Sequence, residues 1–237
     1  MRFDVLTLFP EMFEGVLGAS ILKRAAQDTA QRPAPVSYHI CNIRDHTTDK
    51  HGKVDQAPYG GGPGMVMQCQ PVWDAVAAVE AQDSVPSTRI VMTPQGRRLD
   101  QPIVEDLALK PRLLIIAGHY EGFDERLIEA LAPVERISIG DYVVSGGELP
   151  AMVLIDAIVR LIRGVLGDET SADRESFSDG ADGLLDHPHY TRPAEWRDRS
   201  VPDVLLSGDH GRIEAWRRAE ALKRTRRDRP DLLGGTR

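Results

Sequence analysis

The run at residues 113–117 (LLIIA) constrains the fold most, because five consecutive apolar residues leave no polar face for solvent. A strand of this kind has to be covered on both sides, which is typical of the central strand of a parallel sheet. Helical patterns precede and follow it at residues 100–109 and 124–131. Since parallel strands need crossover connections, this alternation predicts an α/β domain with a mostly parallel sheet.

The same alternation extends over the first two-thirds of the chain. The further expected strands are residues 3–9, 36–43, 90–93 (stopped by Pro94) and 134–139, and the further helices are residues 10–27, 71–81 and 148–162. Periodicity disappears from Gly164 to about Trp196, and a helix over 212–227, capped by Asp209, follows. We expect an α/β domain at 1–163, an interdomain linker at 164–196 and a small helical domain at 197–237.

Composition excludes several classes of protein. No apolar run approaches the roughly 20 residues that cross a bilayer, and the first four residues lack the pattern of a secretory signal. Cys41 and Cys69 are too few and too far apart for a disulfide framework or a zinc site. We therefore expect a cytoplasmic protein with no membrane association and no bound metal.

Charge is distributed unevenly along the chain. The formal net charge of −7 disfavours a nucleic-acid partner, since phosphate binding needs clustered cations. Between Arg212 and Arg229, however, eight lysines and arginines outnumber three acidic residues. A solvated helical face explains such a run as readily as a nucleic-acid surface does.

Three turns rich in small residues follow three successive predicted strands. They are residues 93–96 (TPQG), 118–122 (GHYEG) and 140–148 (GDYVVSGGE). Small residues let main-chain groups approach a ligand closely, and ligands of parallel sheets bind beyond the carboxyl ends of the strands. None of the turns matches a dinucleotide fingerprint or a phosphate-binding P-loop. One such turn would be ordinary, but three after successive strands indicate one shared site for a purine-like ligand with a ribose.

A fourth glycine-rich segment, residues 58–65 (PYGGGPGM), does not follow a central strand. It has no lysine that could reach a phosphate, so we do not expect a nucleoside-triphosphate site there. We expect this segment to pack beside the ligand or beside a bound RNA.

Six motifs occur in order along nearly the whole chain. They are LFPEMF (8–13), APYGGGPGM (57–65), TPQGRRLDQ (93–101), GHYEGFDER (118–126), SIGDYVVSGGELPA (138–151) and HYTRP (189–193). Together they resemble the bacterial tRNA (guanine-N(1))-methyltransferase family, TrmD, of the SPOUT class. The resemblance implies a sheet threaded into a trefoil knot, a homodimer with its active site at the subunit interface, and methylation of tRNA on ring nitrogen 1 of the guanine immediately 3′ of the anticodon.

The resemblance also implies S-adenosyl-L-methionine as the methyl donor, held among the three turns. The residues implicated in donor binding are Thr93, Pro94, Gly118, Tyr120, Glu121, Ile139, Gly140, Asp141, Tyr142, Val143, Val144, Gly146, Gly147 and Pro150. Because the sulfonium carries its own leaving group, the transfer needs no metal for activation. The residues neither require nor exclude a supporting Mg²⁺.

Two further positions match the family's catalytic residues. Guanine nitrogen 1 carries a proton, which a carboxylate can accept while an arginine stabilises the charge that builds on the exocyclic oxygen. The family normally has Asp before Ser at the base position, where this chain has Glu175; Asp173 is a second candidate. Arg160 matches the family's arginine and interrupts an apolar helix, although a salt bridge with Asp156 is the structural alternative.

The resemblance finally points to residues that would grip the tRNA. They are Arg44, His46, Tyr59, His189, Tyr190, Arg192, Lys223 and Arg224. Two alternatives stay open. The first is a related knotted methyltransferase that modifies another RNA base or a ribose. The second is an RNA-binding or nucleotide-sensing protein without catalysis, which only the change from Asp to Glu favours.

Overall fold

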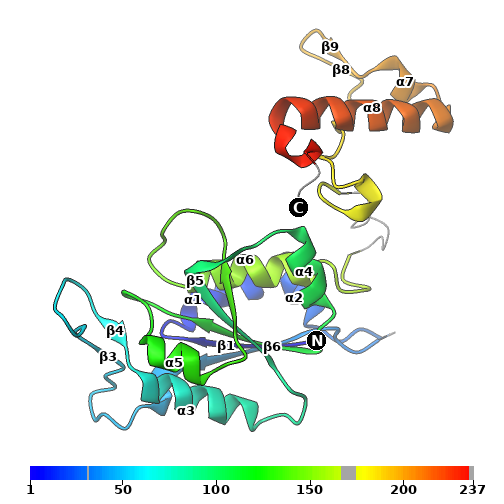
Figure 1. Cartoon of the computed structure of the whole chain (residues 1–237). Helices are drawn as coiled ribbons and strands as arrows, with labels where there is room; N and C mark the ends of the chain where they lie inside the picture. The colour runs from blue at the N-terminus through cyan, green and yellow to red at the C-terminus, as the bar shows by residue number, and fades with distance from the viewer. Residues whose placement is uncertain (31, 167–174, 235–237) are drawn as a thin grey trace. The chain divides into compact units, whose positions relative to one another are not determined.

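The computed structural model describes residues 1–30, 32–166 and 175–234. The chain divides into two compact units, Met1–Gly167 and Asp168–Arg237 (Figure 1). Among the described residues, none of the helices has both the length and the apolar character needed to cross a membrane.

A parallel sheet of five strands forms the centre of the first unit. In spatial order the strands are β2 (Ser37–Asn42), β1 (Arg2–Thr7), β6 (Arg112–Ala117), β5 (Thr88–Arg98) and β7 (Glu135–Ser138). Strand β6 is the middle strand, and all six of its residues are buried. The predicted parallel sheet and its apolar central strand are confirmed.

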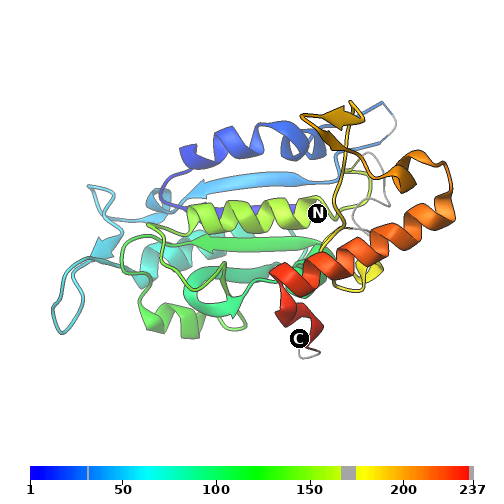
Figure 2. The ribbon, with the colours of Figure 1, turned by 90° about the horizontal axis from the view of Figure 1, so that it is seen from above.

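Helices cover both faces of the sheet (Figures 1 and 2). Helices α1 (Glu11–Leu17), α2 (Ser20–Ala25), α4 (Gln101–Ala108) and α6 (Glu148–Val159) pack on one face, and α3 (Cys69–Glu80) and α5 (Glu125–Ala130) pack on the other. Side chains alternate along β6, so that Leu113 and Ile115 join the first layer while Leu114 and Ile116 join the second. The result is a three-layer α/β sandwich.

The single helix expected over residues 10–27 is wrong, because the chain forms two helices there. Helix α1 ends at Leu17 and is capped by Gly18, whose N–H donates to the Glu14 carbonyl at 2.9 Å. Ala19 is extended, with φ −129° and ψ 159°, before α2 begins. Glycine has a low helix propensity, and the apolar pattern on either side of it does not reveal such a break.

The expectation that Pro94 stops its strand is also wrong, because β5 continues to Arg98. Met92 and Arg97 both lie opposite Ile137, so the residues between them bulge out of the ladder. Proline needs no hydrogen-bond partner in a bulge. A side chain at Gly96 would place its Cβ 2.4 Å from the Ile137 nitrogen, so only glycine lets the strand return to its partner.

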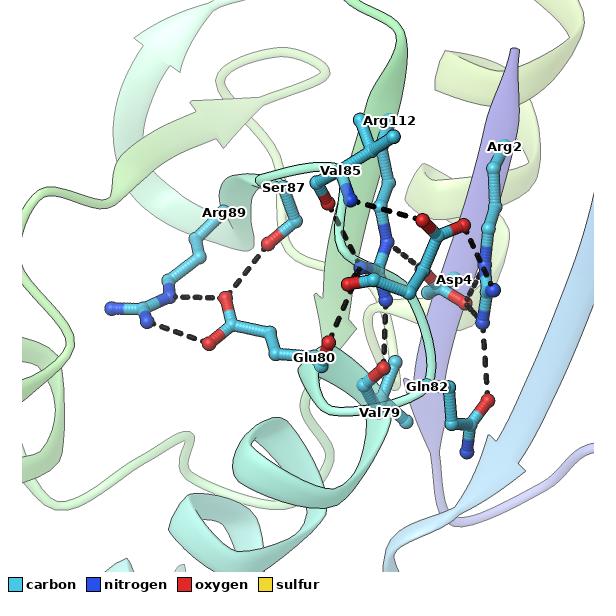
Figure 3. A network of polar contacts seen from close by, with 10 residues as sticks. Arg2, Asp4, Val79, Glu80, Gln82, Val85, Ser87, Arg89 and Arg112 are labelled. Carbon is cyan, nitrogen blue, oxygen red and sulfur yellow. Dashed lines mark hydrogen bonds and ion pairs between the residues drawn. The ribbon is translucent and has the colours of Figure 1, made fainter.

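The amino-terminal edge of the sheet is closed by a buried polar network around Arg112 (Figure 3). This guanidinium donates to Asp4 Oδ2 at 2.7 Å and to the Val79 carbonyl at 2.7 Å, and also to the carbonyls of Asp83 and Val85 at 3.0 Å. Arg112 is only 1% exposed. It therefore satisfies carbonyls at and beyond the end of α3, which would otherwise be buried without donors.

The second unit is built around one long helix, α8 (His210–Asp228). Asp209 caps it by accepting a hydrogen bond from the Arg212 N–H at 3.0 Å, as predicted. The shorter elements are η3 (Asp179–Ala181), β8 (Glu195–Trp196), β9 (Arg199–Ser200), α7 (Asp203–Leu206) and η4 (Pro230–Leu233).

Candidate active site

A cavity of about 260 Å³ lies at the carboxyl ends of β5, β6 and β7, where the three predicted turns meet. The first turn is the bulge within β5, and the other two follow β6 and β7. Every residue implicated in donor binding lines this cavity except Gly140 and Asp141, which belong to the third turn but do not reach it. Turns that are far apart in sequence thus form one site.

The second and third turns are in close contact. The Gly147 N–H donates to the Gly118 carbonyl at 2.6 Å, and His119 forms an antiparallel bridge with Gly146. A Cβ at Gly147 would lie 2.8 Å from the Ala117 Cα and 2.9 Å from the Gly118 nitrogen. No larger residue allows this approach, so glycine is required where the two turns build one wall of the cavity.

A buried carboxylate, Glu148, supports this wall at the first residue of α6. It is 1% exposed, accepts a hydrogen bond from Thr7 Oγ1 at 2.8 Å and lies 3.5 Å from His119 Nδ1. The His119 ring also packs against Phe9, with ring centroids 4.8 Å apart. The amino terminus of a helix favours negative charge, so Glu148 can tie β1 to the second turn at little electrostatic cost.

Sequence reasoning missed three ionisable residues that line the cavity, namely His119, Glu125 and Arg136. Arg136 Nη2 and Glu125 Oε1 form an ion pair of 2.7 Å. His119 stands inside the second turn, Glu125 begins the helix after it, and Arg136 lies on the strand before the third turn. The sequence could have pointed to these three residues, because each lies within or next to one of the predicted turns.

The fourth glycine-rich segment forms the loop between β3 (Asp55–Gln56) and β4 (Val66–Met67). The Glu121 N–H donates to the Met65 carbonyl at 2.9 Å, and the Met67 N–H donates to the Gly122 carbonyl at 2.9 Å. The loop is therefore attached to the second turn, in agreement with the prediction that it packs beside the ligand site. Its Tyr59 side chain is 99% exposed and free to meet a large partner.

The segment that carries Arg44 and His46 is attached to the same turn. Arg44 donates to the Gly52 carbonyl at 3.0 Å and to the Tyr120 hydroxyl at 3.5 Å. His46 Nε2 lies 3.2 Å from Cys41 Sγ. Burial raises the pKa of the Cys41 thiol, so this cysteine stays protonated and is a poor nucleophile.

The predicted catalytic residues do not line the cavity. Arg160 caps the carboxyl end of α6, and a helix of 12 residues spans about 18 Å from the end that carries Glu148. Glu175 belongs to the second unit, where its carbonyl accepts hydrogen bonds from the N–H and hydroxyl of Ser178. Asp173 lies outside the described residues. The first unit therefore brings the predicted donor residues together without the predicted catalytic pair.

The predicted tRNA-binding residues of the second unit fall into two groups. His189 and Arg224 contact Asp186: the His189 ring lies 2.8 Å from its carboxylate, and Arg224 donates to its carbonyl at 3.1 Å. The other three, Tyr190, Arg192 and Lys223, have exposed side chains, and the His189 side chain is itself 70% exposed. The Tyr190 ring lies 6.3 Å from that of Trp216.

A three-layer α/β sandwich with a cavity beyond three adjacent parallel strands defines a protein of the nucleotide- or cofactor-binding α/β class. The family model described as tRNA (Guanine-1)-methyltransferase TrmD matches residues 1–235. The chain belongs to this family, and the resemblance predicted from the six motifs is confirmed.

Curated relatives agree with this assignment over nearly the full length. The chain is 54% identical to a tRNA (guanine-N(1)-)-methyltransferase of Chloroflexus aurantiacus, over 98% of this chain and 88% of the relative. It is 51% identical to the protein of the same name from Bacillus subtilis, over 98% of this chain and 92% of the relative.

Proposed function

We propose that this chain is a cytoplasmic methyltransferase that uses S-adenosyl-L-methionine to methylate ring nitrogen 1 of the guanine immediately 3′ of the anticodon in tRNA. The cavity formed by the three turns is the observation that carries this proposal. It offers main-chain groups for a base edge, apolar side chains such as Ile139 and Val144 for a ring, and the Glu121 carboxylate for hydroxyls or a cation.

The proposed chemistry uses two groups of this chain. Glu175 accepts the proton from guanine nitrogen 1, with Asp173 as the alternative base, and Arg160 stabilises the negative charge that builds on the exocyclic oxygen. The transferred methyl group passes from sulfur to nitrogen, and the sulfonium leaves as a neutral thioether. The glutamate side chain is one methylene longer than that of the usual aspartate. The main chain that carries Glu175 therefore has to lie slightly farther from the guanine.

We further propose a homodimer in which two subunits complete each active site. Four apolar side chains, Met12 and Val16 on α1 and Leu149 and Val153 on α6, are 39–50% exposed on two helices that pack together. Val143 of the third turn is 83% exposed. An exposed apolar face of this kind marks an interaction surface. In this proposed dimer, Glu175 of the partner subunit completes the active site at the cavity that this chain forms.

The contact between the second and third turns also supports the proposed trefoil knot, in which the chain after β7 is threaded past the turn after β6. We propose that residues 164–196 form a linker that carries the catalytic base. Residues 197–237 would form the tRNA-binding domain, whose basic helix α8 contacts phosphates. Tyr59 and Arg44 would contact the same tRNA from the cavity side.

A methyl-transfer assay tests the proposal. The protein is incubated with donor carrying a labelled methyl group and with two tRNAs that differ only in having guanine or adenine 3′ of the anticodon, with Mg²⁺ or with a chelator. We expect label on nitrogen 1 of that guanine only. Label on another base or a ribose would identify a different knotted methyltransferase. Donor binding and tRNA binding without any transfer would identify a nucleotide-sensing protein.

A further inference from the structure

Three metal-ligating side chains meet on one short segment of the second unit. Asp186, His187 and His189 each offer one ligand atom, and these atoms all lie within 4.8 Å of one another. The two imidazole rings are 4.5 Å apart between centroids. The three residues lie on a single stretch of main chain, in which Pro188 restricts the backbone between the histidines.

One atom of this group is left without a partner. His187 Nδ1 is buried and has no hydrogen bond, and it is the single buried side-chain nitrogen or oxygen in this state among the residues that the structure describes. The nearest carboxylate oxygen, Asp186 Oδ1, lies 3.6 Å away, which is too far for a hydrogen bond. Buried polar atoms are nearly always satisfied, so this nitrogen points to a ligand.

Three hydrogen bonds from outside the cluster fix the main chain of the segment. The Leu185 N–H donates to the buried Thr225 hydroxyl at 3.0 Å, and the Asp186 N–H donates to the Ser176 hydroxyl at 2.9 Å. Arg224 binds the Asp186 carbonyl at 3.1 Å. These three contacts engage main-chain atoms. The Asp186 carboxylate accepts a hydrogen bond from the His187 N–H at Oδ1 (2.7 Å), so Oδ2 and the imidazole nitrogens are the atoms that can bind an ion on this preorganised frame.

We propose that Asp186, His187 and His189 bind one divalent transition-metal ion of the Zn²⁺ class. Two imidazoles and a carboxylate suit such an ion, and a fourth position is left for water. Ligand atoms of a tetrahedral zinc site are about 3.3 Å apart, so side-chain rotation closes the observed separations. The ion takes the place of the hydrogen bond of 2.8 Å between His189 and Asp186 and satisfies His187 Nδ1.

This site departs from the expectation of no bound metal, which considered only the two cysteines. It also makes His189 a metal ligand and not a direct tRNA contact. The ion would hold residues 186–189 in place. It would thereby fix the start of the segment that presents Tyr190 and Arg192 to the tRNA. This role rests on the proposed function, whereas the metal site itself does not.

Metal titration of the full chain tests the site. Protein freed of metal by a chelator is titrated with Zn²⁺ by calorimetry, and bound zinc is measured after desalting. We expect one equivalent per chain, and binding weakened about tenfold or more in His187→Ala and in Asp186→Asn, which keeps the size of the side chain. His210→Ala is the matched control, since this histidine is exposed on the same unit, and it should bind like the wild type.

Less than one equivalent of zinc in the wild type, or equal affinity in the wild type and both variants, would overturn the site. Circular dichroism shows whether each variant is folded, and Asp186→Asn keeps the main-chain contacts if His187→Ala does not fold. Donor binding to the same metal-free protein is measured separately. The zinc site and the proposed methyl transfer can therefore fail independently of each other.

Discussion

The two ends of the central strand β6 differ in structure: one is closed by a buried polar network, and the other opens into a cavity. At its amino end, Arg112 is buried and saturated with hydrogen bonds to Asp4 and to the carbonyls around α3. At its carboxyl end, Gly118 begins a turn of small residues that leaves a cavity of about 260 Å³.

The amino end also has a hollow, lined by Glu80, Arg89 and Arg112, but these charged groups are engaged with one another or with main-chain carbonyls (Figure 3). A hollow therefore does not by itself indicate a binding site. The amino edge contributes stability because its polar groups are satisfied by one another, whereas the carboxyl edge can bind a ligand because its turns of small residues leave a cavity open.

Removal of the amino-edge arginine should have the largest effect. Arg112→Ala leaves the fully buried Asp4 with only Arg2 and deprives several carbonyls of their donor, so we expect a loss of about 4 kcal/mol in the free energy of unfolding. Denaturant titration measures this loss. The control is Arg89→Ala, whose partly exposed pair with Glu80 should contribute about 1 kcal/mol or less. Similar losses in both variants would show that burial does not decide the energetics of this edge.

Arg160→Ala should separate catalysis from donor binding. Since Arg160 lies at the far end of α6 from the cavity, we expect kcat to fall about 10²- to 10³-fold while donor affinity changes little. Steady-state kinetics and calorimetry measure the two quantities. Arg163→Ala serves as the control, since this exposed arginine lies three residues further along the chain. If turnover and donor affinity fell equally, the proposed role of Arg160 would be refuted.

Gly147→Ala should weaken donor binding about tenfold or more, equivalent to about 1.4 kcal/mol. The added methyl group would lie 2.8 Å from the Ala117 Cα and would push the second and third turns apart. Calorimetry with the donor measures the effect. Gly15→Ala is the control, because nothing lies within 4 Å of a Cβ at Gly15. Unchanged affinity in Gly147→Ala would mean that the donor does not need the contact between the turns.

The smallest effect should appear at acidic pH. Hydrogen bonds from Arg89 and Ser87 lower the pKa of Glu80 below its ordinary value of 4.5. The stability that this lowered pKa contributes is present above pH 4.5 and is lost as the pH falls through the lowered value. In Glu80→Gln we expect a shallower loss of stability below pH 4.5, with a difference of about 1 kcal/mol or less. An unchanged acid limb of the stability curve would contradict this.

Local patterns predicted much of the carboxyl edge. The LLIIA run required burial on both faces, and the three turns were recognisable because each combines small residues with the end of a strand. The break at Gly18 and the continuation of β5 past Pro94 were not predictable, since a proline in a bulge has the same local sequence as a proline that ends a strand.

The amino edge was not predicted at all. Asp4 and Arg112 are 108 residues apart, and the local sequence around neither residue predicts that they pair. The cluster of Asp186, His187 and His189 was missed for a different reason, because His189 was considered only as a tRNA contact and no role was assigned to Asp186 or His187. Long-range pairing and the orientation of side chains depend on the tertiary fold.

The central claim is that the three turns form the methyl-donor site. Calorimetry of the folded chain with S-adenosyl-L-methionine and with its demethylated product tests it most directly. We predict saturable heat with both ligands, with one binding site per chain. We also predict weaker binding in Gly147→Ala than in Gly15→Ala. The absence of any heat of binding with either ligand would contradict the claim.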